Sequence, residues 1–118
     1  NYYVVLYHRN CLETWSSAPV HLVQDSTVNY DFTGSSSQAF GNNLIKVGNS
    51  PVKYALYSGD VNQDLLVDLS DIVDVLNDAN IFLTGYNVTD VTGDNITDLT
   101  DVILTYNNSA SFALAIWP

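Results

Sequence analysis

Residues 60–71 read DVNQDLLVDLSD, and residues 90–101 read DVTGDNITDLTD. Laid over each other, the two segments both carry Asp at the first, fifth, ninth and twelfth places. Four carboxylates in so short a segment repel one another, so a compact chain would gather them only around a positive charge. Calcium fits this role because it takes about six to eight oxygen ligands, and a twelve-place loop offers them from places 1, 3, 5, 7, 9 and 12.

The predicted ligands follow from this register, with a backbone carbonyl at place 7. In the two loops they are Asp60, Asn62, Asp64, Leu66, Asp68, Asp71, Asp90, Thr92, Asp94, Ile96, Asp98 and Asp101. All of these donors are oxygens, which disfavours zinc, copper and iron, and magnesium is disfavoured because it retains its waters. We therefore predict two calcium sites. The alternative is a pair of solvated acidic loops, since most runs of charge are simply hydrated.

Three places depart from the usual calcium-loop pattern. Place 6 is normally Gly because the loop bends sharply there, but this chain has Leu65 and Asn95. Asn tolerates a left-handed backbone and Leu does so poorly, which predicts strain or a different bend in the first loop. Place 12 is Asp rather than the longer Glu, and Thr92 is a weaker oxygen donor at place 3 of the second loop.

An apolar helical pattern follows each loop, with apolar residues at i, i+3, i+4 and i+7. The positions are Leu69, Ile72, Val73 and Leu76, and then, thirty residues on, Leu99, Val102, Ile103 and Tyr106. The pattern predicts two short amphipathic helices. We expect these helices to bury their apolar faces on each other.

The first half of the chain is predicted to be a β unit. Residues 1–8, NYYVVLYH, are hydrophobic on both faces, which is typical of a central strand with neighbours on both sides. Further strands are predicted within residues 19–24, 27–32, 44–47 and 52–57. We expect an antiparallel β-sandwich-like part that is incomplete at its N-terminus, with no helix before Ser70.

The predicted fold class is therefore α+β, with the two kinds of element segregated along the chain. We expect a β unit over residues 1–58 and a tandem calcium-binding unit over residues 59–118. The last residues, FALAIWP at 112–118, form an apolar tail. This tail is expected either to dock as a final strand or to add to the open sheet edge of a neighbouring subunit.

The negative charge is confined to one half of the chain. The protein has 118 residues and a net charge of -10. Residues 1–59 hold three acidic and three basic residues, whereas residues 60–118 hold ten Asp and no Lys or Arg. Two calcium ions would change the net charge from -10 to -6, so we expect metal to stabilise the fold. Nucleic acid is not expected as a partner, because no basic patch exists to meet phosphates.

No catalytic constellation stands out in the sequence. Cys11 is the single cysteine, and it is more typical of a small buried hydrophobe than of a nucleophile, with His8 and His21 as the available bases. Glu13 has no partner carboxylate nearby in sequence, and the remaining acids are assigned to metal. We therefore do not expect an enzyme. No stretch reaches the length of a membrane span, and no signal peptide is recognisable.

Three segments carry a resemblance to a known family: YHRNCLETW at 7–15, YDFTGSSSQAFGNNL at 30–44 and YALYSGDVNQD at 54–64. Together with the acidic repeat, the chain resembles a dockerin-like tandem calcium-binding repeat joined to a β-domain. Such modules lie at the C-terminus of secreted or surface proteins of Bacteroidetes-like and Ignavibacteria-like bacteria. The resemblance implies the calcium ligands given above and an extracellular or cell-surface location.

Partners remain open at this point. Dockerins bind cohesins through helix residues just inside the loops, commonly a Ser-Thr pair, whereas this chain has Leu69-Ser70 and Leu99-Thr100. We expect a structural, adhesion or assembly module with a protein partner or self-assembly, including a surface filament. The alternative is a tail that anchors a secreted hydrolase to a cohesin-like scaffold. The polar segment at 8–15 leaves a polysaccharide contact open as well.

Overall fold

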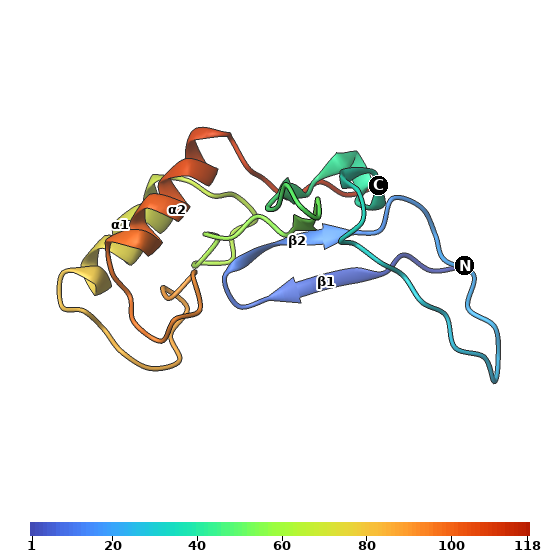
Figure 1. Ribbon diagram of the computed structural model, residues 1–118, viewed down its shortest axis with the longest axis horizontal. Coiled ribbons are helices and arrows are strands. Elements are labelled where there is room, and N and C mark those ends of the chain that lie inside the picture. The colour runs from blue at the N-terminus through green and yellow to red at the C-terminus, as the bar shows by residue number, and fades with distance from the viewer. The chain divides into compact units, whose positions relative to one another are not determined.

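The computed structural model describes residues 1–118, and it places short strands before two helices (Figure 1). In chain order the elements are β1 (Val5–His8), β2 (Cys11–Trp15), the 3-10 helices η1 (Ser36–Gln38) and η2 (Phe40–Asn42), β3 (Ile45–Lys46), β4 (Tyr54–Ala55), α1 (Leu69–Ala79) and α2 (Leu99–Ala110). Small antiparallel sheets thus precede two helices that each follow an acidic loop. The predicted segregated α+β class is confirmed.

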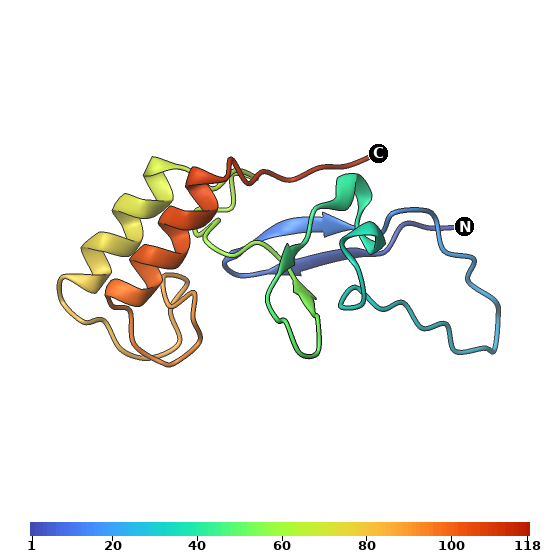
Figure 2. The same cartoon turned by 45° about the horizontal axis from the view of Figure 1, so that its top comes forward.

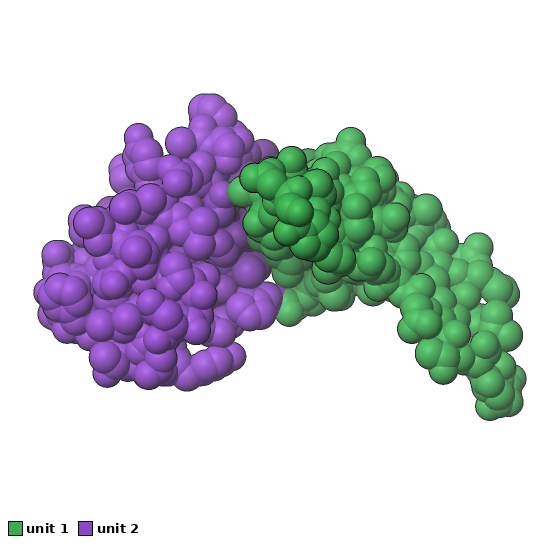
Figure 3. Space-filling view, viewed as in Figure 1, with its two compact units in different colours: residues 1–7, 13–56, 116–118 green, residues 8–12, 57–115 purple.

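The chain divides into two compact units, which are coloured separately in Figure 3. Unit 1 comprises residues 1–7, 13–56 and 116–118, and unit 2 comprises residues 8–12 and 57–115. The turn between β1 and β2 therefore belongs to the same unit as the acidic loops and the helices. This placement was not predicted from the sequence. Neither α1 nor α2 has the length and apolar character that crossing a lipid bilayer requires.

The strands of the first half are fewer and shorter than predicted. One two-stranded sheet holds β1 and β2, and an antiparallel pair of β3 and β4 forms the other, with Ile45 opposite Ala55. The prediction that residues 1–8 form a central strand was wrong, because β1 has β2 as its one neighbour in the sheet. The 3-10 helices η1 and η2 also precede Ser70, where no helix was expected.

The strands predicted within residues 19–24 and 27–32 are absent. Residues 21–29 are exposed throughout and contain no strand, and in the first segment Val20 makes a single bridge to Tyr2. Alternating apolar residues form a strand only where a partner strand and a surface to pack on are available. In the second segment, the Tyr30 hydroxyl donates a hydrogen bond to the Gln38 carbonyl at 2.6 Å.

In unit 2, α1 and α2 lie side by side and run in opposite directions (Figures 1 and 2). Both helices begin with the same capping box. Asp68 caps α1 and Asp98 caps α2. In return, the carboxylate of the Asp at the third helical position, Asp71 or Asp101, accepts the backbone N–H of the N-cap residue. A small core of Leu12, Val67 and Ala113, with Tyr57 packed against it, also lies in this unit.

The loop and helix repeat is preserved in three dimensions. Leu66 in the first loop bridges Leu114, and Ile96 in the second loop bridges Thr84, so each loop pairs with the segment that follows the other loop's helix. The apolar tail therefore docks within its own chain. Its Ile116 bridges Thr14 within unit 1.

The predicted burial of the apolar helix faces was wrong at six of the eight positions, and only Ile72 and Val102 are half-buried. The buried positions of α1 are Asp71, Val75 and Ala79, whereas Leu69 is 70% exposed. An α-helix turns about 100° per residue, so a residue two places before or after Asp71 lies about 160° from it around the axis. Because Asp71 must face the acidic loop, the apolar positions on both sides of it face solvent.

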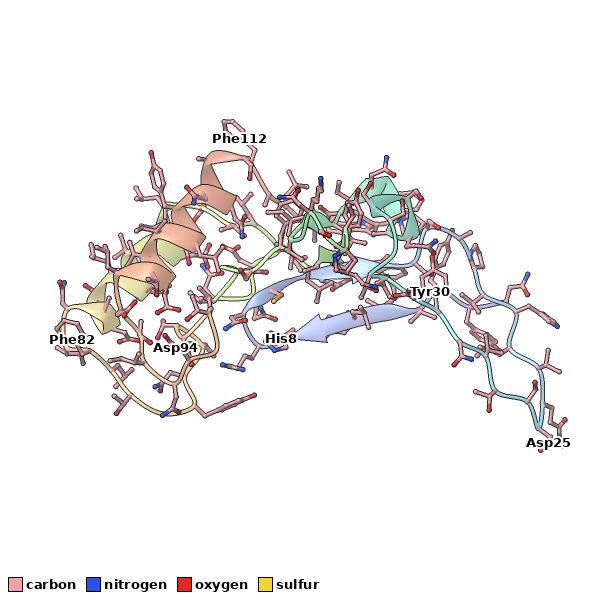
Figure 4. All side chains as sticks on the ribbon, viewed as in Figure 1. His8, Asp25, Tyr30, Phe82, Asp94 and Phe112 are labelled. Carbon is pink, nitrogen blue, oxygen red and sulfur yellow. The ribbon has the colours of Figure 1, made fainter.

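The same displacement occurs on α2, where Asp101, Thr105 and Asn108 are buried. The two helices therefore expose an apolar stripe, which we define as Leu69, Val73, Leu76, Leu99, Ile103 and Tyr106. Phe82 and Phe112, which follow the two helices, are also exposed and point outward at opposite ends of the helix pair (Figure 4).

Candidate metal centre

Each acidic loop wraps around the carboxylate of its first residue. In loop 1, Asp60 accepts the backbone N–H of Asp64 at Oδ1 (3.1 Å) and that of Leu65 at Oδ2 (3.2 Å). In loop 2, Asp90 accepts the N–H of Asp94 at 3.2 Å and that of Asn95 at 2.9 Å. The sequence repeat is therefore a repeat of hydrogen bonding, and both loops close in the same way.

Place 6 takes the same left-handed conformation in both loops. The φ angle is 76° at Leu65 and 75° at Asn95. The first loop therefore does not bend differently, and Leu adopts a conformation that usually falls to Gly or Asn. For a residue with a Cβ, this conformation costs about 1–2 kcal/mol. The predicted strain at Leu65 is thus present in the backbone.

The Asp at place 12 closes each site from the first turn of the following helix. Asp71 accepts the N–H of Val61 at Oδ1 (2.9 Å) and that of its own N-cap, Asp68, at Oδ2 (2.9 Å). Asp101 accepts the N–H of Thr92 at Oδ1 (2.9 Å), as Asp71 accepts that of Asn62 at 3.3 Å, and it accepts the N–H of its own N-cap, Asp98, at Oδ2 (2.8 Å). The capping box thus fixes the carboxylate of place 12 against the start of its loop.

These bonds bring three carboxylates together in each loop. Their ligand oxygens lie within 4.8 Å of one another, and the triads are Asp60, Asp64 and Asp71 in loop 1 and Asp90, Asp94 and Asp101 in loop 2. In both triads the carboxylates of places 1 and 12 are buried and that of place 5 is exposed. Each triad could hold a metal ion, with the residue at place 5 on the solvent side.

The buried carboxylates raise the electrostatic cost of the fold. Burial, and next the charge of Asp71, raise the pKa of Asp60 to about 6. Burial also raises the pKa of Asp71. Placing a charged carboxylate in a protein interior costs several kcal/mol unless a counter-charge is present. A divalent cation in each triad would supply this counter-charge.

Side chains of the protein do not supply enough positive charge for this role. Unit 2 holds ten Asp and a single Arg or Lys, Arg9, which gives a net charge of -9. The Arg9 guanidinium donates to the backbone carbonyls of Asn87 and Asp90, at 3.1 and 3.3 Å. Two divalent cations would change the charge of the unit from -9 to -5.

The remaining predicted ligands lie outside the two triads. Asp68 and Asp98 at place 9 act as helix N-caps, and hydrogen bonds from Ser70 lower the pKa of Asp68. At place 3, Asn62 accepts the N–H of Asp64 at 2.9 Å. Thr92, at place 3 of loop 2, donates to Asp101 at 3.0 Å. Ligation by these four side chains, and by the carbonyls of Leu66 and Ile96, stays a prediction.

The sequence reasoning missed a group of residues that holds the loops from outside. Asn10 is 2% exposed, and its side chain donates to the carbonyls of Val88 and Asp90. In loop 1, Gln63 donates to the Asp60 carbonyl at 2.6 Å and to the Cys11 carbonyl at 3.4 Å. Nothing in the sequence marks Asn10 for this role, because its burial and its partners, which a buried amide requires, appear only in the structure.

The donor set fits a hard cation. Every side-chain donor in the triads is a carboxylate oxygen, which suits calcium, magnesium or manganese rather than a metal that prefers nitrogen or sulfur. Two buried carboxylates and one exposed carboxylate leave the solvent side of each site for further oxygens, including water. No protein-family model, curated protein or solved structure matches this chain.

Proposed function

We propose that this protein is a non-enzymatic, calcium-stabilised extracellular module that serves structure or assembly, as a filament subunit or an adhesin segment. The observation that carries the proposal is the pair of buried Asp triads with matching hydrogen bonds. The carboxylates of each triad would hold one Ca²⁺, joined by the remaining oxygens of places 3, 7 and 9. The ions would neutralise buried charge and fix both helices through Asp71 and Asp101.

Calcium is the metal that these loops suit best. It accepts irregular cages of protein oxygens, whereas magnesium requires near-ideal octahedral geometry and keeps its waters. Extracellular calcium modules typically have dissociation constants of about 10⁻⁴ to 10⁻³ M, so they are occupied outside cells. This supports an extracellular or cell-surface location. The dockerin-like resemblance of the repeat points to the same metal and the same environment.

The side-chain chemistry supports a non-enzymatic role. Burial raises the pKa of the Cys11 thiol to about 11, so the thiol stays protonated and poorly nucleophilic at neutral pH. Glu13 is engaged by the indole N–H of Trp15. Most of the acidic groups that could serve as a general acid or base lie in the metal loops.

Thermal melting with and without calcium tests the proposal. At about 10 mM free calcium, two sites of this affinity would stabilise the fold by about 3–5 kcal/mol, which raises the melting temperature by about 10 °C or more. Asp71→Asn and Asp101→Asn should each remove about half of the shift. Asp74→Asn, an exposed acid of α1 outside the triads, is the matched control and should retain the full shift. Equal melting temperatures in calcium and in chelator would remove the calcium proposal.

A second candidate function, anchoring to a scaffold protein, is favoured by the exposed apolar stripe. Contiguous apolar surface on a soluble protein often marks an interaction site. Because unit 2 carries a charge of -9, or -5 with two calcium ions, the best partner has an apolar surface edged by Lys and Arg. Copies of unit 2 would repel one another at this face. The charge therefore favours a scaffold domain over self-association through the stripe.

Binding to cohesin-like domains separates the two functions. The double variant Leu69→Ser and Leu99→Ser alters the stripe at exposed positions, and Val47→Ser alters an exposed apolar residue of unit 1. Anchoring predicts calcium-dependent binding that the stripe variant loses and the Val47 variant keeps. Purified protein that binds no cohesin-like domain but forms polymers favours the structural module. Binding that both variants keep would remove the stripe from the argument.

A further inference from the structure

The turn between β1 and β2 contacts the start of both acidic loops within unit 2. The Asn10 backbone carbonyl accepts the N–H of Gly59, the residue before loop 1, at 2.7 Å. The Asn10 side-chain amide donates to the carbonyls of Val88 and Asp90, at 3.1 and 2.9 Å, where loop 2 begins. One buried residue is therefore bonded to the first place of loop 2 and to the residue preceding loop 1.

The neighbours of Asn10 strengthen both connections. Arg9 donates to the carbonyls of Asn87 and Asp90 and lies over the Tyr86 ring, 4.1 Å from its centroid. On the other side, Gln63 of loop 1 donates to the Cys11 carbonyl. We call residues 8–12 the tip. Its bonds to loop 2 span about eighty positions in sequence, so the loops are held by a segment remote from both.

The two loops lack a β-bridge to each other. Loop 1 bridges Leu114 and loop 2 bridges Thr84, as described above. Contact between the sites therefore runs through the helix pair and through the tip. Of these two routes, the tip alone is bonded to the main chain at or next to the first ligand of each loop. An ion that orders one loop would fix the position of Asn10, whose side chain donates to the carbonyl of Asp90.

We propose that Asn10, supported by Arg9, couples the two calcium sites, so that occupancy of one triad favours occupancy of the other. This inference rests on the proposed calcium binding. The tip is ordered once, by the first ion, and the second ion binds to a loop that is already positioned. Coupling between sites typically changes affinity by about 5- to 150-fold, and we expect about tenfold here. Asn10 is a positioning residue, since its side chain bonds to carbonyls and not to the ion.

A thermodynamic cycle tests the coupling. Calcium titrations of the wild type give the product of its two macroscopic binding constants. Asp71→Asn and Asp101→Asn each leave one site, and these give the two single-site constants. The wild-type product should exceed the product of the single-site constants by about tenfold. In an Asn10→Ala background this excess should fall below twofold, whereas Asn77→Ala, an exposed Asn of α1, should preserve it.

Amide hydrogen exchange gives a readout that a loss of general stability would not reproduce. In Asp101→Asn, calcium bound at site 1 should slow exchange of the loop 2 amides of Gly93 and Asn95, which bond to Asp90. With Asn10→Ala added, calcium should leave these amides unaffected while it still slows exchange at Leu65 in loop 1. Should Asn10→Ala not fold in saturating calcium, Arg9→Met runs the same cycle, because it removes two donors and keeps the apolar stem.

The outcomes separate the two proposals. A wild type that binds no calcium overturns the proposed function and this inference with it. A wild type that binds two ions independently overturns the coupling and leaves the calcium proposal intact. Coupling that persists in both Asn10→Ala and Arg9→Met assigns communication to the helix pair and overturns the role of the tip.

Discussion

Leu65 has a left-handed backbone conformation, with φ at 76°, so the free-energy penalty of this conformation can be measured by substitution. Replacing Leu65 by Gly removes the steric penalty, and replacing it by Ala keeps the penalty while also removing the side chain. The difference in the free energy of unfolding between the two variants therefore measures the contribution of the backbone conformation alone. The penalty for a residue with a Cβ is about 1–2 kcal/mol, and the extra chain entropy of Gly offsets about 0.5–1 kcal/mol of it. We expect Leu65→Gly to be more stable than Leu65→Ala by about 1 kcal/mol.

The neighbouring residue provides a control of opposite sign. Leu66 is not among the residues with positive φ, so Leu66→Gly should be less stable than Leu66→Ala by about 0.5–1 kcal/mol. Urea unfolding in saturating calcium measures all four variants. The expected difference at Leu65 corresponds to about 4 °C in melting temperature. If Ala is as stable as Gly at Leu65, or more stable, the assigned bend of loop 1 is incorrect.

Three further predictions follow from the loops and the helices. In the metal-free fold the pKa of Asp60 is raised to about 6, above its unfolded value, so protonation of Asp60 favours the folded state. Without metal, the melting temperature should therefore rise as the pH falls from about 7.5 to 5. Calcium affinity should weaken below about pH 6, and calorimetry follows both effects. Gly59→Ala should cost about 1–2 kcal/mol more in urea unfolding than Gly93→Ala, because both have positive φ but only the Cβ at Gly59 meets neighbours, with Val67 at 3.0 Å. Leu69→Ser and Leu99→Ser should each change the free energy of unfolding by less than about 0.5 kcal/mol, since both side chains are mostly exposed; a loss of several kcal/mol would place them in the core.

The acidic repeat carried most of what the sequence could predict. The register of Asp60 with Asp90 and of Asp71 with Asp101 predicted two matched acidic loops, each followed by a helix, and both features are present. This success has a local cause, because the bonds that close each loop join residues at most ten positions apart. Sequence spacing alone determines which groups can meet over that distance.

The helix faces show where periodicity is ambiguous. The apolar positions of α1 have the spacing of a buried stripe, yet Val75 and Ala79 are buried and Leu69 is exposed. The helix is oriented by Asp71, which must reach the loop, and this requirement outweighs the burial of Leu69 and Val73. An apolar stripe identifies a face of a helix, but it does not establish that the face packs within the same chain.

The β unit and the tip depended on long-range contacts. Residues 27–32 alternate as a strand would, but no partner strand is placed beside them, and they remain without strand structure. Asn10 bonds to Val88 across 78 positions, and no spacing rule connects them. Spacing within a single sequence does not reveal such long-range pairings, so the contacts between the tip and the two loops became visible only in the structure.

The most direct measurement is a crystal structure of the protein grown in calcium, with anomalous scattering recorded to identify the ions. We expect two calcium peaks, one in each triad, with Asp60, Asp64 and Asp71 oxygens about 2.3–2.6 Å from the first and the matching residues around the second. Well-ordered triads that hold only water, or carboxylates that turn away from each other toward solvent, would contradict the central claim.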